Sequence, residues 1–197
     1  MHTRLIENFS SKNVQLNEQE IALVQSLFVY RKYRKNQYIL QQGDIARHET
    51  YVISGLARTY LLDDKGQEHV ISFNPEDYWI GDLYSFHTGK PTQHNIDCLE
   101  DTNVLQITKQ DSEKLLREIP KLAVFYMHLY RNSVVSYHHR VGSSLSKNAM
   151  ERYKEFQERF PLIEQRVPNH QIASFLGITP QSLSRLRKQY LINKASR

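Results

Sequence analysis

The chain has 197 residues, 40% of them hydrophobic, and a formal net charge of +5 at pH 7. This length allows one large domain or two modest ones, and the hydrophobic share is enough for packed cores. No apolar run approaches the roughly 20 residues of a membrane-spanning helix, and no apolar signal region opens the chain, so we expect a cytoplasmic protein without a membrane partner. Cys98 is the one cysteine, which excludes an intramolecular disulfide and a cysteine-held iron–sulfur cluster within one chain.

The first 30 residues predict a short helical lead-in. Asn17 is placed to cap a turn that carries Glu18 and Glu20, and the apolar residues between Ile21 and Phe28 form a stripe that can pack on the next part of the chain. We interpret this segment as structural rather than functional.

From Tyr33 to Lys109 the pattern changes to short alternating segments separated by turn residues. Predicted strands span residues 38–40, 51–53, 57–62, 69–73 and 104–107. The hairpin around Asp64-Lys65-Gly66 is the clearest turn. Many short strands with evenly spaced turns favour a sandwich or a jelly roll over a parallel sheet.

Two helices are predicted next, one at residues 110–117 that ends before Pro120 and a longer one from Leu122 to about Gly142. Apolar residues of the longer helix recur at mixed spacings of three and four, which is typical of a seam for a partner helix. The seam residues that we expect are Phe125, Leu129, Val134, His138 and Val141. The same pattern also fits a helix that packs only on its own β-domain. We expect a hinge at residues 142–144 and a first C-terminal helix at 147–160.

Residues 169–188 predict two short helices joined by a tight turn, the helix-turn-helix pattern. Ile172 and Leu176 give the first helix an apolar face, and Gly177 supplies the left-handed residue that ends it. Thr179 can cap the second helix, and Pro180 suits its first position. Polar side chains of the second helix point outward. The residues that we expect to contact DNA are Thr179, Gln181, Ser182, Ser184, Arg185 and Lys188, together with His170 of the first helix.

Positive charge is concentrated in the same part of the chain. From Lys147 onward there are ten Lys and Arg against four Glu, a net charge of +6, whereas the rest of the chain carries −1. Such a surplus fits the electrostatic footprint of a DNA-binding domain, although a basic tail can also serve solubility alone. Arginine can donate to both acceptors of guanine, and glutamine can pair with adenine, so Arg185 and Gln181 are the predicted base readers of double-stranded DNA.

The chain resembles the Crp/Fnr transcription regulators. The residues that carry the resemblance are the turn glycines Gly43, Gly55, Gly66 and Gly81, the segment Tyr51-Val52-Ile53-Ser54-Gly55 with Arg58 soon after, and the C-terminal helix-turn-helix. The resemblance implies an α+β fold, with a cyclic-nucleotide-binding-like jelly roll at residues 1–118, a dimerisation helix and hinge at 119–145, and a winged-helix-like DNA-binding domain at 146–197. It also implies a homodimer and raises RNA polymerase as a partner. A short wing, if one exists, is expected near residues 162–167.

The sensor part departs from the cyclic-AMP-binding pattern of that family. Members that bind cyclic AMP follow Gly-Glu-Leu with an Arg-Ser pair that neutralises the phosphate, whereas this chain has no Arg between Arg58 and Arg117. A buried phosphate without a paired cation is costly, so we do not expect cyclic AMP as the effector. Candidate residues for a ligand pocket are Gly81, Asp82, Leu83, Lys90 and His94.

Other interpretations stay open. One is a regulatory module that binds a cyclic nucleotide or another small ligand without any DNA function, and another is an ordinary helical hairpin at the C-terminal end. An enzyme is a weaker alternative, because the sequence contains no P-loop, no GxGxxG and no Ser-His-Asp order. The nine histidines are scattered, and His138 and His139 point in different directions on a helix, so we expect no metal site and no other cofactor.

Overall fold

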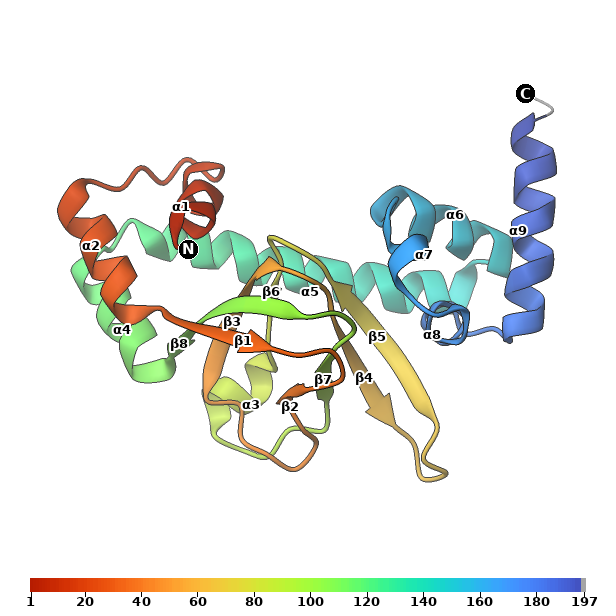
Figure 1. Cartoon of the computed structure of the whole chain (residues 1–197), viewed down its shortest axis with the longest axis horizontal. Coiled ribbons are helices and arrows are strands. Elements are labelled where there is room, and N and C mark those ends of the chain that lie inside the picture. The colour runs from red at the N-terminus through yellow and green to blue at the C-terminus, as the bar shows by residue number, and fades with distance from the viewer. Residues whose placement is uncertain (196–197) are drawn as a thin grey trace.

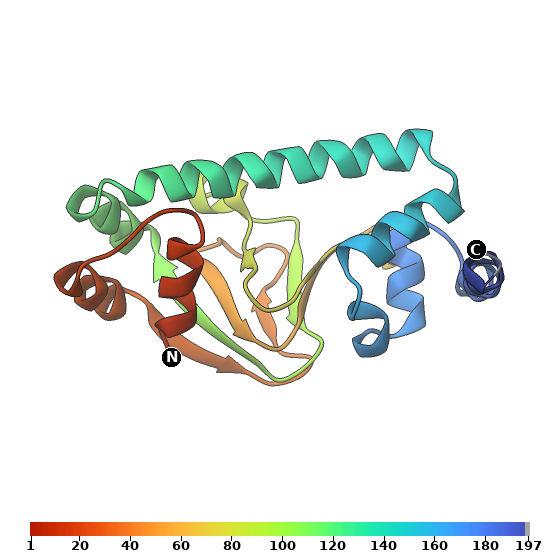
Figure 2. The same cartoon turned by 90° about the horizontal axis from the view of Figure 1, so that it is seen from above.

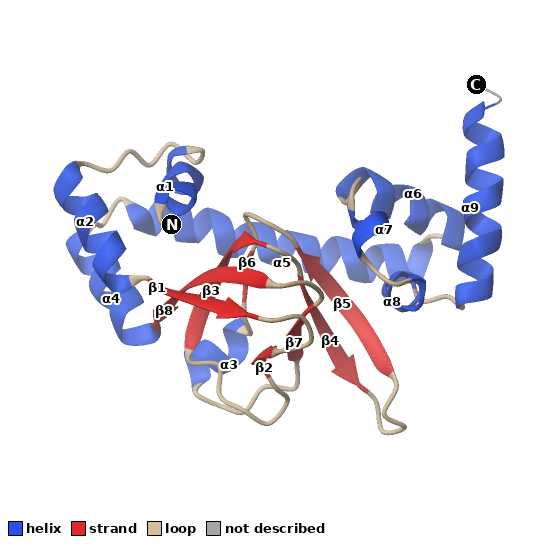
Figure 3. Cartoon of the chain, viewed as in Figure 1, coloured by secondary structure: helices blue, strands red, loops and turns tan. Residues whose placement is uncertain are grey.

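The computed structural model describes residues 1–195, with side chains as far as Ile192. Figure 1 shows a central β-domain, a pair of N-terminal helices at one end and a helical C-terminal domain at the other. The long helix α5 (Leu122–Ser146) runs past the β-domain and connects the two ends, as the view from above makes clear (Figure 2). The positions of helices and strands along the chain can be followed in Figure 3.

Two antiparallel four-stranded sheets form the β-domain, in the orders β1-β8-β3-β6 and β2-β7-β4-β5. The strands are β1 (Val29–Tyr33), β2 (Tyr38–Leu40), β3 (His48–Ser54), β4 (Ala57–Leu62), β5 (Glu68–Asn74), β6 (Trp79–Ile80), β7 (Asn95–Cys98) and β8 (Thr102–Thr108). The jelly roll and all five predicted strands are confirmed. Strands β1, β6 and β7 were not predicted. Exposed charged residues obscure β1, β6 has only two residues, and half of β7 is polar.

The predicted N-terminal lead-in consists of α1 (Thr3–Ser10) and α2 (Glu18–Leu27). The predicted cap at Asn17 is confirmed, because Asn17 and Glu20 form a reciprocal capping box. Phe9 and Val24 pack in one core with residues of β3, β8, α4 (Lys109–Glu118) and the start of α5. The lead-in therefore fixes the long helix against the β-domain.

The hinge expected at residues 142–144 is wrong, since α5 continues unbroken through them. Its serines satisfy their polar groups without ending the helix: Ser146 donates to the carbonyl of Gly142, and Ser143 donates to Glu155. The break lies at Lys147 and Asn148, where Asn148 caps α6 (Ala149–Arg159) in a capping box with Glu151.

The C-terminal domain continues with α7 (Ile163–Arg166), α8 (Asn169–Leu176) and α9 (Pro180–Ala195). A wing is not formed at residues 162–167, where α7 makes one helical turn, and no β-strand occurs within residues 149–195. The helical character of the domain is confirmed, but the winged-helix expectation is not borne out in this described segment.

One hydrophobic core joins the two domains. The ring of Phe73 in β5 packs against three rings of the C-terminal domain. Its centre lies 6.3 Å from those of Phe156 in α6 and Phe160 just after α6, and 5.3 Å from that of Phe175 in α8. Aromatic rings at such distances contribute beyond the area that they bury. The β-domain and the C-terminal domain are thus packed together through side chains rather than joined by α5 alone.

Gly55, between β3 and β4, has φ of +96°, and a Cβ placed there would lie 2.5 Å from the carbonyl oxygen of Asp101. Gly55→Ala is therefore expected to lower the free energy of unfolding by about 3 kcal/mol, from steric overlap added to left-handed strain. Gly66→Ala is the matched control, since φ is +74° there but no heavy atom lies within 4 Å. Gly66→Ala should lower the free energy of unfolding by about 1 kcal/mol. Denaturant unfolding followed by the fluorescence of Trp79, at fixed protein concentration, measures both; equal losses would contradict the prediction.

Candidate DNA interface and sensor site

The turn between α8 and α9 forms as its residue types require. Gly177 has φ of +66° in the left-handed region and donates to the carbonyl of Ser174, while Ile178 donates to the carbonyl of Ala173. At the start of α9, the hydroxyl oxygen of Thr179 accepts the backbone N–H of Ser182 at 3.2 Å. The predicted helix-turn-helix is confirmed as a local structure, and its second helix has a fixed starting point.

The residues predicted to contact DNA lie on the outer side of this motif. Leu183 is fully buried against the domain core and sets the inner face of α9. Ser182 is half-buried, and the other predicted contacts are exposed, namely His170, Thr179, Gln181, Ser184, Arg185 and Lys188. Arg185 and Lys188 form no ion pair with any residue that the structure describes, so both charges face solvent.

Arg187, two residues beyond Arg185, has a different role that the sequence did not reveal. Its guanidinium donates to Glu164 at 2.9 Å and to the side-chain oxygen of Asn169 at 2.6 Å. Glu164 also accepts the hydroxyl of Tyr153. Arg187 thereby holds α9 against α7 and α8, and a positioned recognition helix is what base contacts require.

The β-domain contacts the helix-turn-helix directly at the edge strand β5. The hydroxyl of Ser174 in α8 donates to the carbonyl of Glu68 at 2.8 Å and accepts the N–H of Val70 at 3.0 Å. Arg140 of α5 donates to the carbonyls of Val70 and Phe175, and its guanidinium lies 4.2 Å above the Phe175 ring. Three elements, α5, β5 and α8, therefore meet at one point.

A second contact between the domains is an ion cluster around Arg166 of α7. Its guanidinium donates twice to Glu76, at 3.0 Å each, and twice to Glu100, at 2.8 and 3.0 Å. Glu76 also accepts the backbone N–H of Gly55. Burial raises the pKa of Glu76, and the hydrogen bonds from Arg166 and the backbone outweigh that effect, so the pKa lies below its ordinary value and the carboxyl is ionised.

Arg166→Ala should lower the free energy of unfolding by about 1 to 3 kcal/mol, because two half-buried carboxylates lose their shared cation and are left near each other. Arg166→Lys should fall between wild type and the alanine variant, since a lysine keeps the charge but cannot donate in a fork. Thermal unfolding and protease cleavage at residues 147–148 measure the loss. Unchanged stability in both variants would show that the cluster does not hold the domains together.

The outer face of α5 carries a largely apolar stripe that the β-domain leaves uncovered. Its residues are spaced by three and four in alternation, which is the heptad pattern of a coiled-coil seam. They are Val124, Met127, Arg131, Val134, His138, Val141 and Leu145. All seven are exposed, with Val134 at 54% and Val141 at 58% of their full accessible surface.

Two of the predicted seam residues face the other way. Phe125 is 3% exposed and packs edge-on against Phe9 of α1, with ring centres 4.8 Å apart, and Leu129 is packed against the same core. The expectation that both belong to a partner contact is wrong, because α5 has two apolar faces and these residues lie on the inner one. Val134, His138 and Val141 lie on the outer face, as predicted.

Comparison with known proteins gives concordant results for sequence and for structure. Residues 30–118 match the profile of the cyclic nucleotide-binding domain. The fumarate and nitrate reduction regulatory protein of Vibrio cholerae is 27% identical over 185 residues, covering 87% of this chain and 72% of that protein. The anaerobic regulatory protein of Haemophilus influenzae is 26% identical over 185 residues, covering 87% of this chain and 70% of that protein.

Among solved structures, FixK2 from Bradyrhizobium japonicum superposes with a TM-score of 0.72 at 19% identity, covering 85% of this chain and 86% of that one. CLP from Xanthomonas campestris, described as a c-di-GMP responsive global regulator, gives a TM-score of 0.70 at 13% identity, covering 90% and 93%. These structures support the fold, and the two curated regulators support the role. The chain is therefore similar to the Crp/Fnr transcription regulators in sequence and in fold.

These relatives are regulatory proteins rather than enzymes, and they support a DNA-binding regulator of transcription as the role of this chain. Within the described residues, no helix combines the length and the apolar character that crossing a membrane demands. The same residues contain no cluster of three or more His, Cys, Asp and Glu side chains suited to a metal ion.

In the segment that was predicted to bind a ligand, the carboxylate of Asp82 is already hydrogen-bonded by its own neighbours. Asp82 caps α3 (Leu83–Thr88) by accepting the N–H groups of Tyr84 and Ser85, accepts the hydroxyl of Thr92 at 2.5 Å, and lies 3.3 Å from His94. Burial raises the pKa of Asp82, but these donors outweigh it and lower the pKa, so a carboxylate fills this position.

Of the predicted pocket residues, Gly81, Asp82 and Leu83 line one broad groove beside α5, whereas Lys90 and His94 do not line it. Lys90 is exposed, and its backbone carbonyl accepts the hydroxyl of Ser85. Leu83 lines the broad groove below α5, whereas Gly81 borders both that groove and a separate cavity under the β2–β3 loop. The nearby guanidinium of Arg58 is buried and bonded to Asp97 and Glu68, so it is not available to a phosphate.

Glu49 of β3 is a buried carboxylate that the sequence did not single out. It is 5% exposed and accepts the hydroxyl of Tyr130 at 2.5 Å and that of Ser112 at 3.4 Å, without a cation partner among the described residues. Burial raises its pKa, and the two hydroxyl donors offset this only in part. The contact links β3 to α4 and α5.

Because the folded pKa of Glu49 is raised, its contribution to stability is fully present below the ordinary pKa of a glutamate and is lost as pH rises through the folded pKa. Glu49→Gln is therefore expected to gain stability relative to wild type as pH increases from about 4 to about 7. Paired denaturation curves at several pH values check this. A difference between the two proteins that does not change with pH would contradict it.

Proposed function

We propose that the protein acts as a homodimer that reads a two-fold symmetric DNA site through the outer face of α9. The observation that carries the proposal is the placement of Gln181, Ser184, Arg185 and Lys188 on the exposed side of a helix whose inner side is fixed by Leu183. Unpaired cations and amides on such a face are the groups that contact base edges and phosphates in the major groove.

Dimer formation follows from the uncovered stripe on α5. Burying its valines, Met127 and Leu145 against a second copy would remove apolar surface from water, which is the main driving force of association. Two parallel α5 helices would carry the two helix-turn-helix motifs at the same end of the dimer. Recognition helices in such pairs enter successive major grooves about 34 Å apart.

The proposed base contacts differ from those common in the Crp/Fnr family. There a Glu is often found three residues before the Ser-Arg pair, whereas this chain has Gln181 before Ser184-Arg185. A Glu accepts from cytosine, and Gln favours adenine. We assign guanine to Arg185 and expect an operator with adenine where other members read cytosine.

A signal in the β-domain has two physical routes to the DNA-reading unit. One is the contact of Ser174 and Arg140 with β5, and the other is the Arg166 cluster. An effector would shift the population between dimers that differ at these contacts. The lack of an arginine between Arg58 and Arg117 that could pair with a phosphate argues against cyclic AMP as that effector. Acting on transcription, the protein would work beside RNA polymerase on cytoplasmic DNA.

Binding to duplex DNA at a series of salt concentrations tests the proposal. We expect the affinity for duplexes recovered from a random pool to fall steeply as salt increases, because bound phosphates release counterions. The mass of the complex should correspond to two chains on one duplex. Binding that is absent at low salt, or one chain per duplex at saturation, would contradict the proposal.

A further inference from the structure

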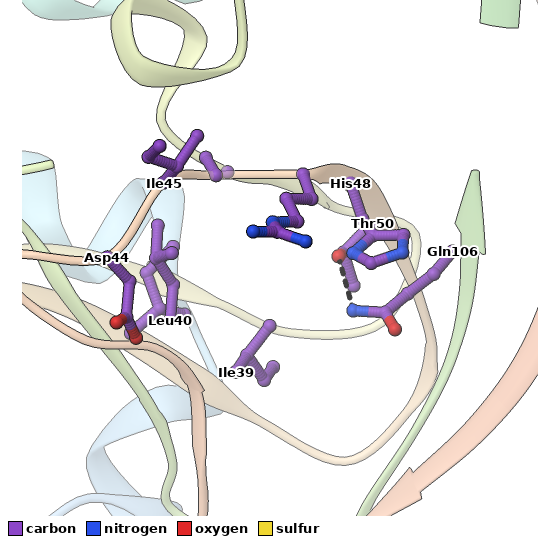
Figure 4. A pocket seen from close by; sticks show the side chains of 11 residues that line it. Ile39, Leu40, Asp44, Ile45, His48, Thr50 and Gln106 are labelled. Atoms are coloured by element: carbon purple, nitrogen blue, oxygen red, sulfur yellow. Dashed lines mark hydrogen bonds between the residues drawn. The ribbon is translucent and has the colours of Figure 1, made fainter. Parts of the chain in front are cut away.

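A cavity of about 360 Å³ lies under the loop that connects β2 and β3, and of the residues predicted to bind a ligand it includes Gly81 alone. Figure 4 shows its labelled side chains, which come from β2, the β2–β3 loop, β3 and β8 and surround one space. Pockets that bind small organic molecules have about this volume or somewhat more, and combine apolar walls with a few polar groups. The residues that line this cavity likewise include an apolar group and a polar group.

The apolar wall is formed by Ile39 and Leu40 of β2 and by Ile96 of β7. Ile96 is buried in the interior of the roll, whereas Ile45 at the loop is 43% exposed. An exposed isoleucine beside a cavity leaves apolar surface in water, and a ligand with an apolar body would cover it.

The polar wall is held by hydrogen bonds within the roll. The side-chain amide nitrogen of Gln106 donates to the hydroxyl of Thr50 at 3.1 Å, and its oxygen accepts the hydroxyl of Tyr33 at 3.3 Å. Both Gln106 and Thr50 are buried. The amide carries a second N–H for which the described residues provide no partner, so it can donate to a group inside the cavity.

Positive charge borders the same space. Arg47 and His48 line the cavity, and neither forms an ion pair with the residues that the structure describes. Burial lowers the pKa of His48, and the positive charges of Arg31 and Arg47 lower it further. Asp44 is the carboxylate of the lining, Figure 4 shows it on the side away from His48, and it forms no ion pair with a residue that the structure describes.

We propose that this cavity binds a small organic acid, with its carboxylate at Arg47 and Gln106 and its apolar body against Ile39, Leu40 and Ile96. An ionised oxygen bonded to a guanidinium makes a strong, directed contact, and the apolar wall selects a hydrophobic body over a plain inorganic anion. The role of such an acid as the effector rests on the proposed function. The binding itself does not, because it requires neither DNA nor the dimer.

The probe that we select is phenylacetate, and phenylacetamide is the neutral molecule of the same shape. In amide NMR spectra of the full-length protein, phenylacetate should shift the signals of residues 39–50, 96 and 106 and bind at least about fivefold more tightly than phenylacetamide. Arg47→Gln should weaken phenylacetate binding about tenfold, while Arg117→Gln, an exposed arginine on α4, should leave it unchanged.

Three results would overturn the proposal: equal binding of the acid and the amide, unchanged binding in Arg47→Gln, or shifts confined to residues 81–94. Because Arg47 is exposed, the variant is expected to fold, and its spectrum verifies this in the same experiment. Failure of DNA binding with intact phenylacetate binding would reject the proposed function alone. Intact DNA binding without phenylacetate binding would reject the cavity proposal alone.

Discussion

Replacing Val134 and Val141 together with aspartate is expected to convert the dimer to a monomer. Both side chains are more than half exposed in the single chain, so the change should cost the monomer little stability. In a coiled-coil seam the same residues would face their copies, and four carboxylates would lose hydration close together. Light scattering coupled to size exclusion should report half the wild-type mass at micromolar concentration.

The same double variant should lose at least about a hundredfold in affinity for a two-fold DNA site, because each motif would then bind its half-site alone. Gln110→Asp with Asn132→Asp is the matched control, since it places the same number of carboxylates on exposed positions of α4 and α5 outside the seam. Dimerisation through α5 is supported if the seam variant is monomeric while the control keeps the wild-type mass and DNA affinity. A seam variant that stays dimeric would place the interface elsewhere.

Arg185→Ala is expected to weaken binding to a selected DNA site by about 1 to 3 kcal/mol for each half-site and to relax the preference at one base pair. The side chain is exposed and unpaired, so circular dichroism and thermal unfolding should match wild type. Fluorescence anisotropy with the selected duplex and with single-base variants of it measures both effects. Equal losses on every duplex would assign Arg185 to a phosphate instead.

Two other residues of α9 serve as controls for Arg185. Lys188→Ala should weaken binding to all sequences by a similar amount and reduce the salt dependence, as expected for a phosphate contact. Arg187→Ala should instead destabilise the domain, because Glu164 and Asn169 lose their donor. We therefore expect a different effect from each of these three basic residues: loss of base preference, loss of general DNA affinity, and loss of stability.

The parts of the fold that depend on local chemistry could be predicted from the sequence. Gly177 and Thr179 specify the turn and cap of the helix-turn-helix, Asn17 specifies the start of α2, and the Asp64 to Gly66 hairpin specifies the β4–β5 connection. Each of these signals is complete within about five residues, so no distant contact is needed to interpret it.

The parts that depend on distant contacts could not be predicted. Phe125 and Val134 are both apolar residues of one helix, and only the packing of Phe9 against α5 shows which face is covered. A glycine such as Gly142 often ends a helix. Here α5 continues through it, and Arg140 and Ser143 on either side bond to β5 and α6. Arg185 and Arg187 differ in role because Glu164 and Asn169 lie beside only one of them.

The sensor site illustrates the same limit. Gly81, Asp82 and Leu83 were predicted to line a ligand pocket, but the carboxylate of Asp82 is already bonded to Thr92 and to the start of α3. The cavity under the β2–β3 loop draws its walls from four strands and a loop, and no short motif predicts it. Sequence spacing cannot show whether a polar side chain is already paired within the fold.

The central claim is that α9 of each chain reads bases in one half of a symmetric site. Selection of bound duplexes from a random pool, with wild type and Arg185→Ala in parallel, tests it most directly. We predict that wild type recovers two inverted half-sites whose centres are about 10 base pairs apart, and that one guanine in each half is lost with the variant. No two-fold motif from wild type, or an unchanged guanine with the variant, would contradict the account.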